Sequence, residues 1–102
     1  MQKNQLGNTR TLDIHGAFVR RADLSGVSLR RANLTHTDAT NASFRGADFE
    51  GAVLTGTILR GADLTGAKNL TLEQLSTSII DDSTILPEYI DRAKLRSVTT
   101  SK

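Results

Sequence analysis

The sequence contains no cysteine and a single proline, and only 4% of its 102 residues are aromatic. The lack of cysteine excludes disulfide bonds and zinc sites built from thiolates. Apolar residues make up 37% of the chain, which is lean for a globular core and raises the alternative of a disordered chain. No apolar run reaches the ~18 residues of a membrane span, and the N-terminus lacks the apolar run of a signal peptide. We therefore expect a cytoplasmic protein that does not enter a membrane.

A repeat with a period of five residues takes the place of the usual signs of helix and strand. Between Leu12 and Thr71 the chain divides without insertion into twelve quintets. The third place is apolar in eleven of them, the first place is alanine in eight, and the fifth place holds seven of the eight glycines. This regular spacing argues against disorder, and neither the helical period of about 3.6 nor the strand period of about 2 produces it.

The pattern predicts that each quintet forms one short side and one corner. The first and third places then point inward, the second and fourth places face solvent, and glycine at the fifth place reaches the positive φ of a corner at no steric cost. Aspartate recurs at the second place, where it is expected to support its own turn. The large side chains expected at the centre are Ile14, Val19, Leu24, Leu29, Leu34, Phe44, Phe49, Leu54, Leu59 and Leu64.

Several quintets share a motif, among them ADLSG (22–26), ADFEG (47–51) and ADLTG (62–66). They resemble the motif of the pentapeptide-repeat family, which is a small residue, Asp or Asn, Leu or Phe, a polar residue and often Gly. The resemblance implies an all-β solenoid, a right-handed quadrilateral β-helix in which four quintets make one coil, so that residues 12–71 form about three coils. Inward residues twenty apart then stack in columns, one of which is expected to hold Leu29, Phe49 and Asn69. Family members are often bacterial proteins, and cyanobacteria are rich in them.

The pattern changes after residue 71, where we expect a cap that covers the open end of the solenoid. Thr71 and Gln74 read as a capping box, which predicts a helix to about residue 78 with Leu72, Leu75 and Ile79 on one face. Pro87 suits the first turn of a second helix over 88–97. The stretch LTLEQLSTSIIDDSTILP also resembles the tails of bacterial family members. The expected division is a lead-in or degenerate quintet at 1–11, the repeat at 12–71, a C-terminal helical cap at 72–97 and a frayed tail at 98–102.

Candidate chemistry is sparse. His15 and His36 share a side of adjacent coils, but no convincing third ligand accompanies them, so we expect surface histidines and no metal. Asp23 and Asp63 are expected two coils apart, a separation that could serve an inverting glycosidase. Aspartate recurs at the same place in other quintets, however, so a turn-supporting role is the simpler interpretation. We expect no catalytic residue and no cofactor.

One side of the predicted coil combines apolar and arginine side chains at places where the repeat is otherwise polar. Apolar residues flanked by arginine are common in protein interfaces, so this side is a candidate partner surface or homodimer contact. The alternative is ordinary scatter of exposed apolar residues. The candidate residues are Phe18, Arg20, Arg21, Ile58 and Arg60 on this side, together with Val53 on the preceding side.

The expected function is that of a non-catalytic scaffold that binds another protein. One branch of the family protects DNA gyrase by mimicking DNA, but that role requires a long, strongly acidic rod, and this chain has a net charge of +2. A purely structural module taken from a longer repeat array is a further alternative. Nucleic-acid binding through arginines is another, opposed by the interspersed acidic residues and the lack of aromatic platforms. The arginines concerned are Arg20, Arg21, Arg30, Arg31, Arg45 and Arg60.

Overall fold

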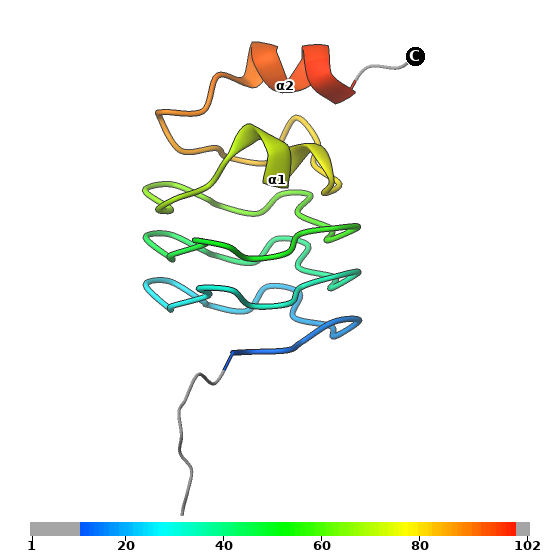
Figure 1. Ribbon diagram of the computed structural model, residues 1–102, viewed down its shortest axis with the longest axis vertical. Coiled ribbons are helices and arrows are strands. Elements are labelled where there is room, and N and C mark those ends of the chain that lie inside the picture. Colours follow the sequence, from blue (N-terminus) through cyan, green and yellow to red (C-terminus); the bar gives the residue numbers. More distant parts are fainter. Residues whose placement is uncertain (1–10, 100–102) are drawn as a thin grey trace, which may run out of the picture.

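The computed structural model describes residues 11–99, and side chains through Leu95. The lead-in expected at 1–11 lies outside this range apart from Thr11. The described chain winds upward as a stack of coils, and two short helices, α1 (Leu72–Ser76) and α2 (Arg92–Thr99), lie over its C-terminal end (Figure 1).

Parallel β-bridges between residues twenty apart hold the coils together. Each bridge is flanked by two backbone hydrogen bonds, as where the Leu24 N–H donates to the Ser43 carbonyl at 2.8 Å and the Ser43 N–H donates to the Ala22 carbonyl at 2.9 Å. The bridges form four rows, one on each wall of the coil, which we call sides 1 to 4. The rows are Asp13–Asn33–Val53 on side 1, Phe18–Asp38–Ile58 on side 2, Asp23–Ser43–Asp63 on side 3 and Ser28–Asp48–Lys68 on side 4.

Corners lie at the fifth place of each quintet, as the repeat predicted. The seven glycines there have φ between +66° and +73°. Four other fifth-place residues adopt the same left-handed conformation: Arg21, Arg31, His36 and Asn41. The second-place aspartates support their own turns, which confirms the prediction: Asp23 accepts from the Ser25 N–H at 3.1 Å, and Asp63 accepts from the Thr65 N–H at 3.0 Å.

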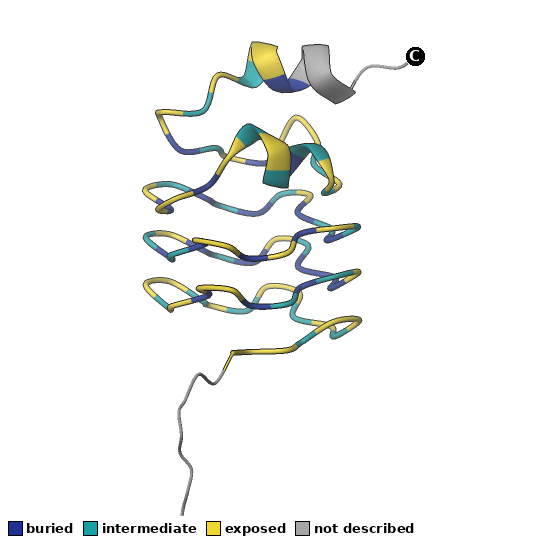
Figure 2. Cartoon of the chain, viewed as in Figure 1, coloured by how far each residue is buried: buried dark blue, intermediate teal, exposed yellow. Residues whose placement is uncertain are grey.

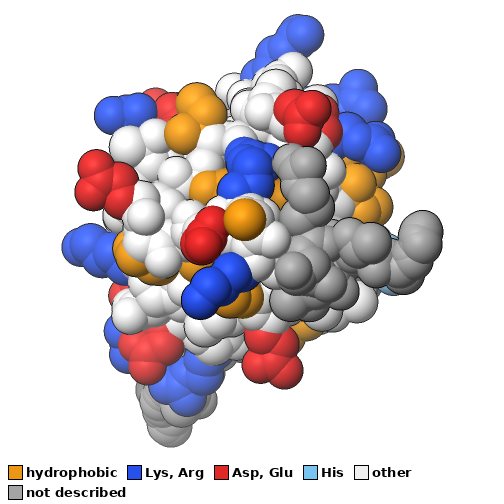
Figure 3. All heavy atoms as spheres, turned by 90° about the horizontal axis from the view of Figure 1, so that it is seen from above, with side chains coloured by type: hydrophobic (Ala, Val, Ile, Leu, Met, Phe, Trp, Pro, Cys, Tyr) orange, Lys and Arg blue, Asp and Glu red, His pale blue; other side chains and the backbone are white. Residues whose placement is uncertain are grey.

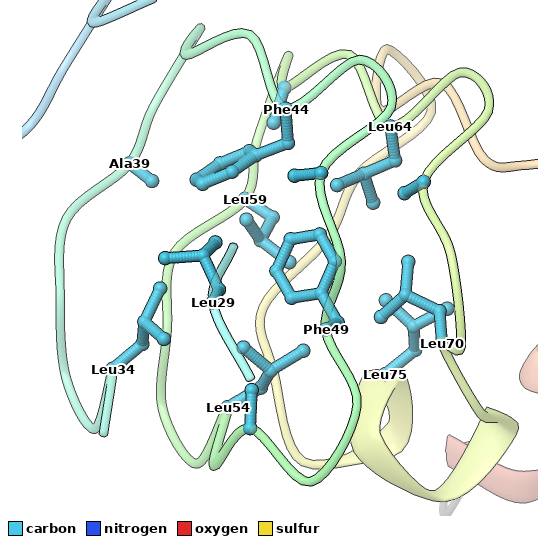
Figure 4. Close-up of a cluster of buried hydrophobic side chains, with 14 of the residues drawn as sticks. Leu29, Leu34, Ala39, Phe44, Phe49, Leu54, Leu59, Leu64, Leu70 and Leu75 are labelled. Atoms are coloured by element: carbon cyan, nitrogen blue, oxygen red, sulfur yellow. The ribbon is translucent and has the colours of Figure 1, made fainter. Parts of the chain in front are cut away.

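The centre of the stack is a continuous apolar core (Figure 4). The rings of Phe44 and Phe49 pack at a centroid distance of 5.4 Å and a tilt of 56°, beside the small side chain of Ala39 (Figure 4). Threonine replaces alanine at two first places, where the buried hydroxyl of Thr57 donates to the Leu34 carbonyl at 2.6 Å. The large third-place residues that are fully enclosed are Leu29, Leu34, Phe44, Phe49, Leu54, Leu59 and Leu64.

The N-terminal end of the stack is open. Three of the expected core residues, Ile14, Val19 and Leu24, are only partly buried. None of the residues from 11 to 28 is classed as buried, and the lowest coil carries only intermediate and exposed colours along most of its length (Figure 2). The interior of the first coil is therefore less enclosed than the interiors of the coils above it.

The fourth column ends differently from the prediction. Asn69 is exposed, takes φ +62° and donates from its side chain to the Asp48 carboxylate at 2.9 Å. Leu70 is buried in its place, at 4% exposure. The period of five thus breaks at Asn69, three residues before helix α1 begins, because an asparagine accepts the left-handed conformation and its polar side chain is better placed in solvent.

The tail is less helical than predicted. Helix α1 ends at Ser76, and Ile79 does not share a face with Leu72 and Leu75 but lies outside. Ile79 extends the side 2 row by bridging to Ile58, and Ile85 extends the side 3 row by bridging to Asp63. The next residues, Ile80 and Leu86, pack against the core instead. The tail therefore adds a partial coil before it adds a second helix.

Helix α2 begins four residues later than predicted, at Arg92. Pro87 is buried and precedes the helix, so it does not occupy the first turn. Asp91 stands at the start of the helix, where its carboxylate accepts from the Ala93 N–H at 3.0 Å. Leu95 is buried against the core, and Ile90 is partly buried. The helix continues to Thr99, where the sequence had suggested a frayed tail from residue 98.

Candidate functional site

Side 2 carries most of the predicted interaction residues. Phe18 is 82% exposed and begins a row that continues through Asp38 and Ile58 to Ile79, which is 37% exposed. Apolar side chains therefore occupy three of the four positions of this row. Bridge-row positions point outward from the wall. Phe18 and Ile79 are exposed there, and Ile58 is partly buried.

Arg20 is held against this row by an ion pair. Its Nε lies 2.8 Å from the Asp38 carboxylate of the next coil. Asp38 is 7% exposed although it lies on an outer wall. The hydrogen bond from the Thr40 hydroxyl lowers the pKa of Asp38, with a smaller contribution from Arg20, and outweighs the effect of burial. Asp38 therefore stays negatively charged at neutral pH. Because Asp38 neutralises its guanidinium, Arg20 offers a partner its hydrocarbon stem more than a free charge.

Arg60 stands at the same place two coils later but has a different neighbour. An arginine or serine at the fourth place bonds to the second-place side chain of the next coil, as in the pairs Arg20–Asp38, Ser25–Ser43, Arg30–Asp48 and Arg45–Asp63. The residue that continues the row above Ile58 is Ile79, which offers no carboxylate. Within residues 11–99, neither Arg60 nor the corner residue Arg21 has an ion pair. Both guanidinium groups are thus free to meet a partner's carboxylates.

Val53 lies on the preceding side, as predicted, and the structure adds two surface residues, Ile79 and Ile85. Val53 is 44% exposed but belongs to side 1, in a row with Asp13 and Asn33. Ile79 and Ile85 were not predicted as surface residues, since both were assigned to the helical cap. Their signal was present in the paired apolar residues of SIIDD (78–82) and TILPE (84–88), which are degenerate quintets.

The remaining arginines do not form one basic face. Arg30 pairs with Asp48 at 3.2 Å and Glu50 at 2.7 Å on side 4, and Arg45 pairs with Asp63 at 3.0 Å on side 3. Viewed from above the C-terminal end, charged side chains of both signs surround the outline of the molecule (Figure 3). A nucleic-acid surface needs a continuous basic track, which this arrangement does not provide.

The histidines and aspartates do not assemble into a catalytic or metal centre. Among residues 11–95, no group of three or more metal-ligating side chains is close enough to hold an ion. His15 contacts its own neighbour Asp13 at 2.7 Å. Asp63 accepts from the Thr65 hydroxyl, and this hydrogen bond is the main cause that lowers its pKa. A catalytic general acid requires a raised pKa, whereas the pKa of Asp63 is lowered.

Two hollows lie at corners of the stack. One of about 300 Å³ is lined by Arg30, Arg31, Glu50 and Gly51. The other, of about 210 Å³, is lined by Arg20, Arg21, Thr40 and Asn41. Small-molecule sites are usually lined by apolar and aromatic side chains, which both of these hollows lack. In the part of the chain that the structure describes, no helix is both long enough and apolar enough to cross a membrane.

Comparison with known proteins agrees with the geometry. Among solved structures, the pentapeptide repeat protein Rfr23 from the cyanobacterium Cyanothece 51142 is 26% identical, with a TM-score of 0.66 over 76% of this chain and 52% of that one. HetL from the cyanobacterium Nostoc sp. strain PCC 7120, a pentapeptide repeat protein involved in heterocyst differentiation regulation, is 29% identical over 74% of this chain and 41% of that one, with a TM-score of 0.39. QnrB1, a plasmid-mediated fluoroquinolone resistance protein, is 16% identical over 83% of this chain and 42% of that one, with a TM-score of 0.43.

The chain therefore spans about half the length of these structures, or less. No curated protein matches it in sequence. The family model for pentapeptide repeats matches residues 13–46 and 32–68 with eight copies of the repeat, and the two ranges together cover more than half of the chain. The chain belongs to the pentapeptide-repeat family.

Proposed function

We propose that this chain is a non-catalytic scaffold, a right-handed quadrilateral β-helix whose side 2 binds another protein. The observation that carries the proposal is the row Phe18–Asp38–Ile58–Ile79, with apolar side chains presented to solvent beside the unpaired Arg60. Protein interfaces are enriched in aromatic residues and arginine, and hot spots combine the two. The partner that fits side 2 has an apolar centre flanked by carboxylates.

The rigid wall of the solenoid suits this role. Backbone hydrogen bonds join Asp38 and Ile58 to the coils on both sides, and the coil above holds the segment around Phe18. Side 2 is therefore ordered before it binds, and binding does not have to order it. Asp38 is already neutralised by Arg20 at 2.8 Å and does not repel carboxylates of a partner.

A test compares the full chain with two variants as bait for partner capture. Phe18→Ser with Ile58→Ser removes the apolar side chains, and Arg60→Glu reverses the free charge. Each is expected to reduce the amount of captured partner at least about tenfold, the size of effect that loss of one hot-spot contact produces. Ile85→Ser is the matched control, because Ile85 occupies an equivalent outward position on side 3.

The proposal fails if the Phe18→Ser/Ile58→Ser variant, with an unchanged thermal unfolding curve, captures the same partner in the same amount as the parent chain. Nucleic-acid binding makes a different prediction. It requires a gel shift that weakens steeply with salt and is reduced by Arg21→Glu and Arg31→Glu alike.

A further inference from the structure

The N-terminal end of the stack combines two unpaired features that call for a partner. Its interior side chains Ile14, Val19 and Leu24 are only partly buried. Among residues 11–99, the backbone N–H groups of Phe18 and Ser28, on the lower edge of the first coil, have no hydrogen-bond acceptor. The equivalent group of Asp38, one coil higher, donates to the Ala17 carbonyl at 2.8 Å. The first coil therefore presents an apolar centre surrounded by an unpaired β-edge.

The other end of the stack does not offer a complementary surface. Helices α1 and α2 lie over the C-terminal end (Figure 1). The Gln74 side chain donates to the carbonyls of Phe49 and Ala52, each at 2.9 Å. The N–H groups of Ile79 and Ile85 in the tail donate to the carbonyls of Thr57 and Ala62. Head-to-tail stacking is thereby blocked, and an open N-terminal end can be covered only by another N-terminal end, which produces a closed two-fold pair.

The ten residues that precede the described chain contain few large apolar side chains. Each coil has at least three large apolar third-place residues, while residues 1–10 include only Met1 and Leu6 as large apolar residues. We propose that the N-terminal end binds the same end of a second copy of this chain, by antiparallel pairing of the two first coils.

Charge selects how the two ends are oriented. Around the first coil, acidic and basic walls alternate: sides 1 and 3 carry Asp13 and Asp23, and sides 2 and 4 carry the arginine pairs Arg20–Arg21 and Arg30–Arg31. His15 also lies on side 1 and contacts Asp13. A two-fold axis through the middle of any side places like walls together. An axis along a diagonal of the square places every acidic wall against a basic one, and like-charge apposition is strongly disfavoured in interfaces.

The area of the end is sufficient for association. The two shorter dimensions of the molecule are 24 and 24 Å, so each end measures about 24 × 24 Å, or about 580 Å². Two apposed ends bury about twice that area, which is near the lower bound of about 1,200 Å² for specific protein interfaces. The dimer is therefore expected to form at micromolar and higher concentrations and not to be permanent.

Sedimentation equilibrium of the full chain tests the proposal. A species of twice 11.0 kDa is expected. Val19→Lys is expected to give a monomer that stays folded, since a lysine there can extend through the open end into water. Val53→Lys, an apolar wall residue away from the end, is the control and should remain dimeric. A monomeric parent chain at about 100 μM, or a dimeric Val19→Lys variant, overturns the proposal.

Charge variants provide a second test that does not touch the core. Arg21→Glu with Arg31→Glu leaves sides 2 and 4 only Arg20 and Arg30, which are already paired with carboxylates, and adds a carboxylate to each side. This variant should weaken the dimer at least about tenfold. An equimolar mixture of this variant with Asp13→Lys/Asp23→Lys should restore a dimer, and failure of the mixture to associate contradicts the role of wall charge in the pairing. Arg60→Glu lies in the third coil and should leave the mass unchanged, so that failure of the dimer and failure of side 2 as a binding surface are distinguishable.

Discussion

Gly46 and Gly56 occupy the same place in their quintets and share one conformation, with φ of +72° and +66°. Their surroundings differ. A methyl group added at Gly46 meets nothing within 4 Å, whereas one added at Gly56 lies 2.3 Å from Cδ2 of His36, the corner residue one coil below. The same pair of positions thus separates the conformational role of glycine from its steric role.

We expect Gly46→Ala to lower the free energy of unfolding by about 1 kcal/mol, the cost of the left-handed conformation for a residue with a Cβ. Gly56→Ala carries the same conformational cost and must also displace the His36 ring, so a further loss of about 1–2 kcal/mol is expected. Urea denaturation followed by circular dichroism measures both values.

A double-mutant cycle isolates the steric part. With His36→Ala in the background, Gly56→Ala should cost no more than Gly46→Ala, because the imidazole ring is no longer in the way. Equal costs of the two glycine substitutions in the parent chain would show that the ring moves aside freely.

At the level of elements, helix α1 depends on one side chain that has two roles. Gln74 completes a capping box: its Oε1 accepts from the Thr71 N–H at 2.9 Å, and its own N–H donates to the Thr71 hydroxyl at 3.0 Å. Its Nε2 donates to the carbonyls of Phe49 and Ala52 at the end of the solenoid. The same residue therefore starts the helix and fixes it to the coil below.

Gln74→Glu should separate these roles. The carboxylate keeps the acceptor of the capping box but cannot donate to two carbonyls, so we expect a loss of about 2 kcal/mol in the free energy of unfolding at pH 7. Thr71→Val, which removes the capping hydroxyl alone, should cost about 1 kcal/mol. If chemical denaturation gives Gln74→Glu no larger a loss than Thr71→Val, the bonds to the carbonyls do not contribute.

The tail also shows how far an element can be inferred from sequence. The capping box of α1 was predicted because its signal is local: two side chains three residues apart decide it. The pairing of Ile79 and Ile85 was not predicted, because it depends on carbonyls and N–H groups of a coil about twenty residues away. Thr84 is the clearest missed sign, since its buried hydroxyl donates to the Leu59 carbonyl at 2.7 Å, just as Thr57 bonds to Leu34 one coil below.

For the whole molecule, the repeat predicts more of the fold than of the surface. Third-place residues were predicted to point inward because this arrangement separates the apolar third places from the charged residues at the second and fourth places. The openness of the first coil around Val19 could not be inferred, because it depends on what lies beyond the repeat and not on the repeat. The freedom of Arg60 likewise depends on Ile79, which belongs to the tail.

Aspartates on all four sides couple the stability of the whole stack to pH. Hydrogen bonds from the following residues are the main cause of the lowered pKa of Asp38 and Asp63. The pKa is also lowered at four further aspartates, which are Asp13, Asp23, Asp48 and Asp81. A folded pKa below the unfolded value means that the carboxylates stabilise the fold above about pH 4 and that this contribution is lost as the pH falls further.

We therefore expect the melting temperature to be insensitive to these groups between about pH 5 and 8 and to fall steeply below about pH 4. Asn33 shows how to test the cause, since its amide oxygen accepts from the Thr35 N–H at 3.1 Å as the aspartates do in their own turns. Asp38→Asn with Asp63→Asn keeps these turns but removes two titrating groups, so its acid unfolding should begin at lower pH than that of the parent chain. Thermal melts at a series of pH values measure the difference, and coincident curves for the two proteins would mean that acid unfolding arises from other groups.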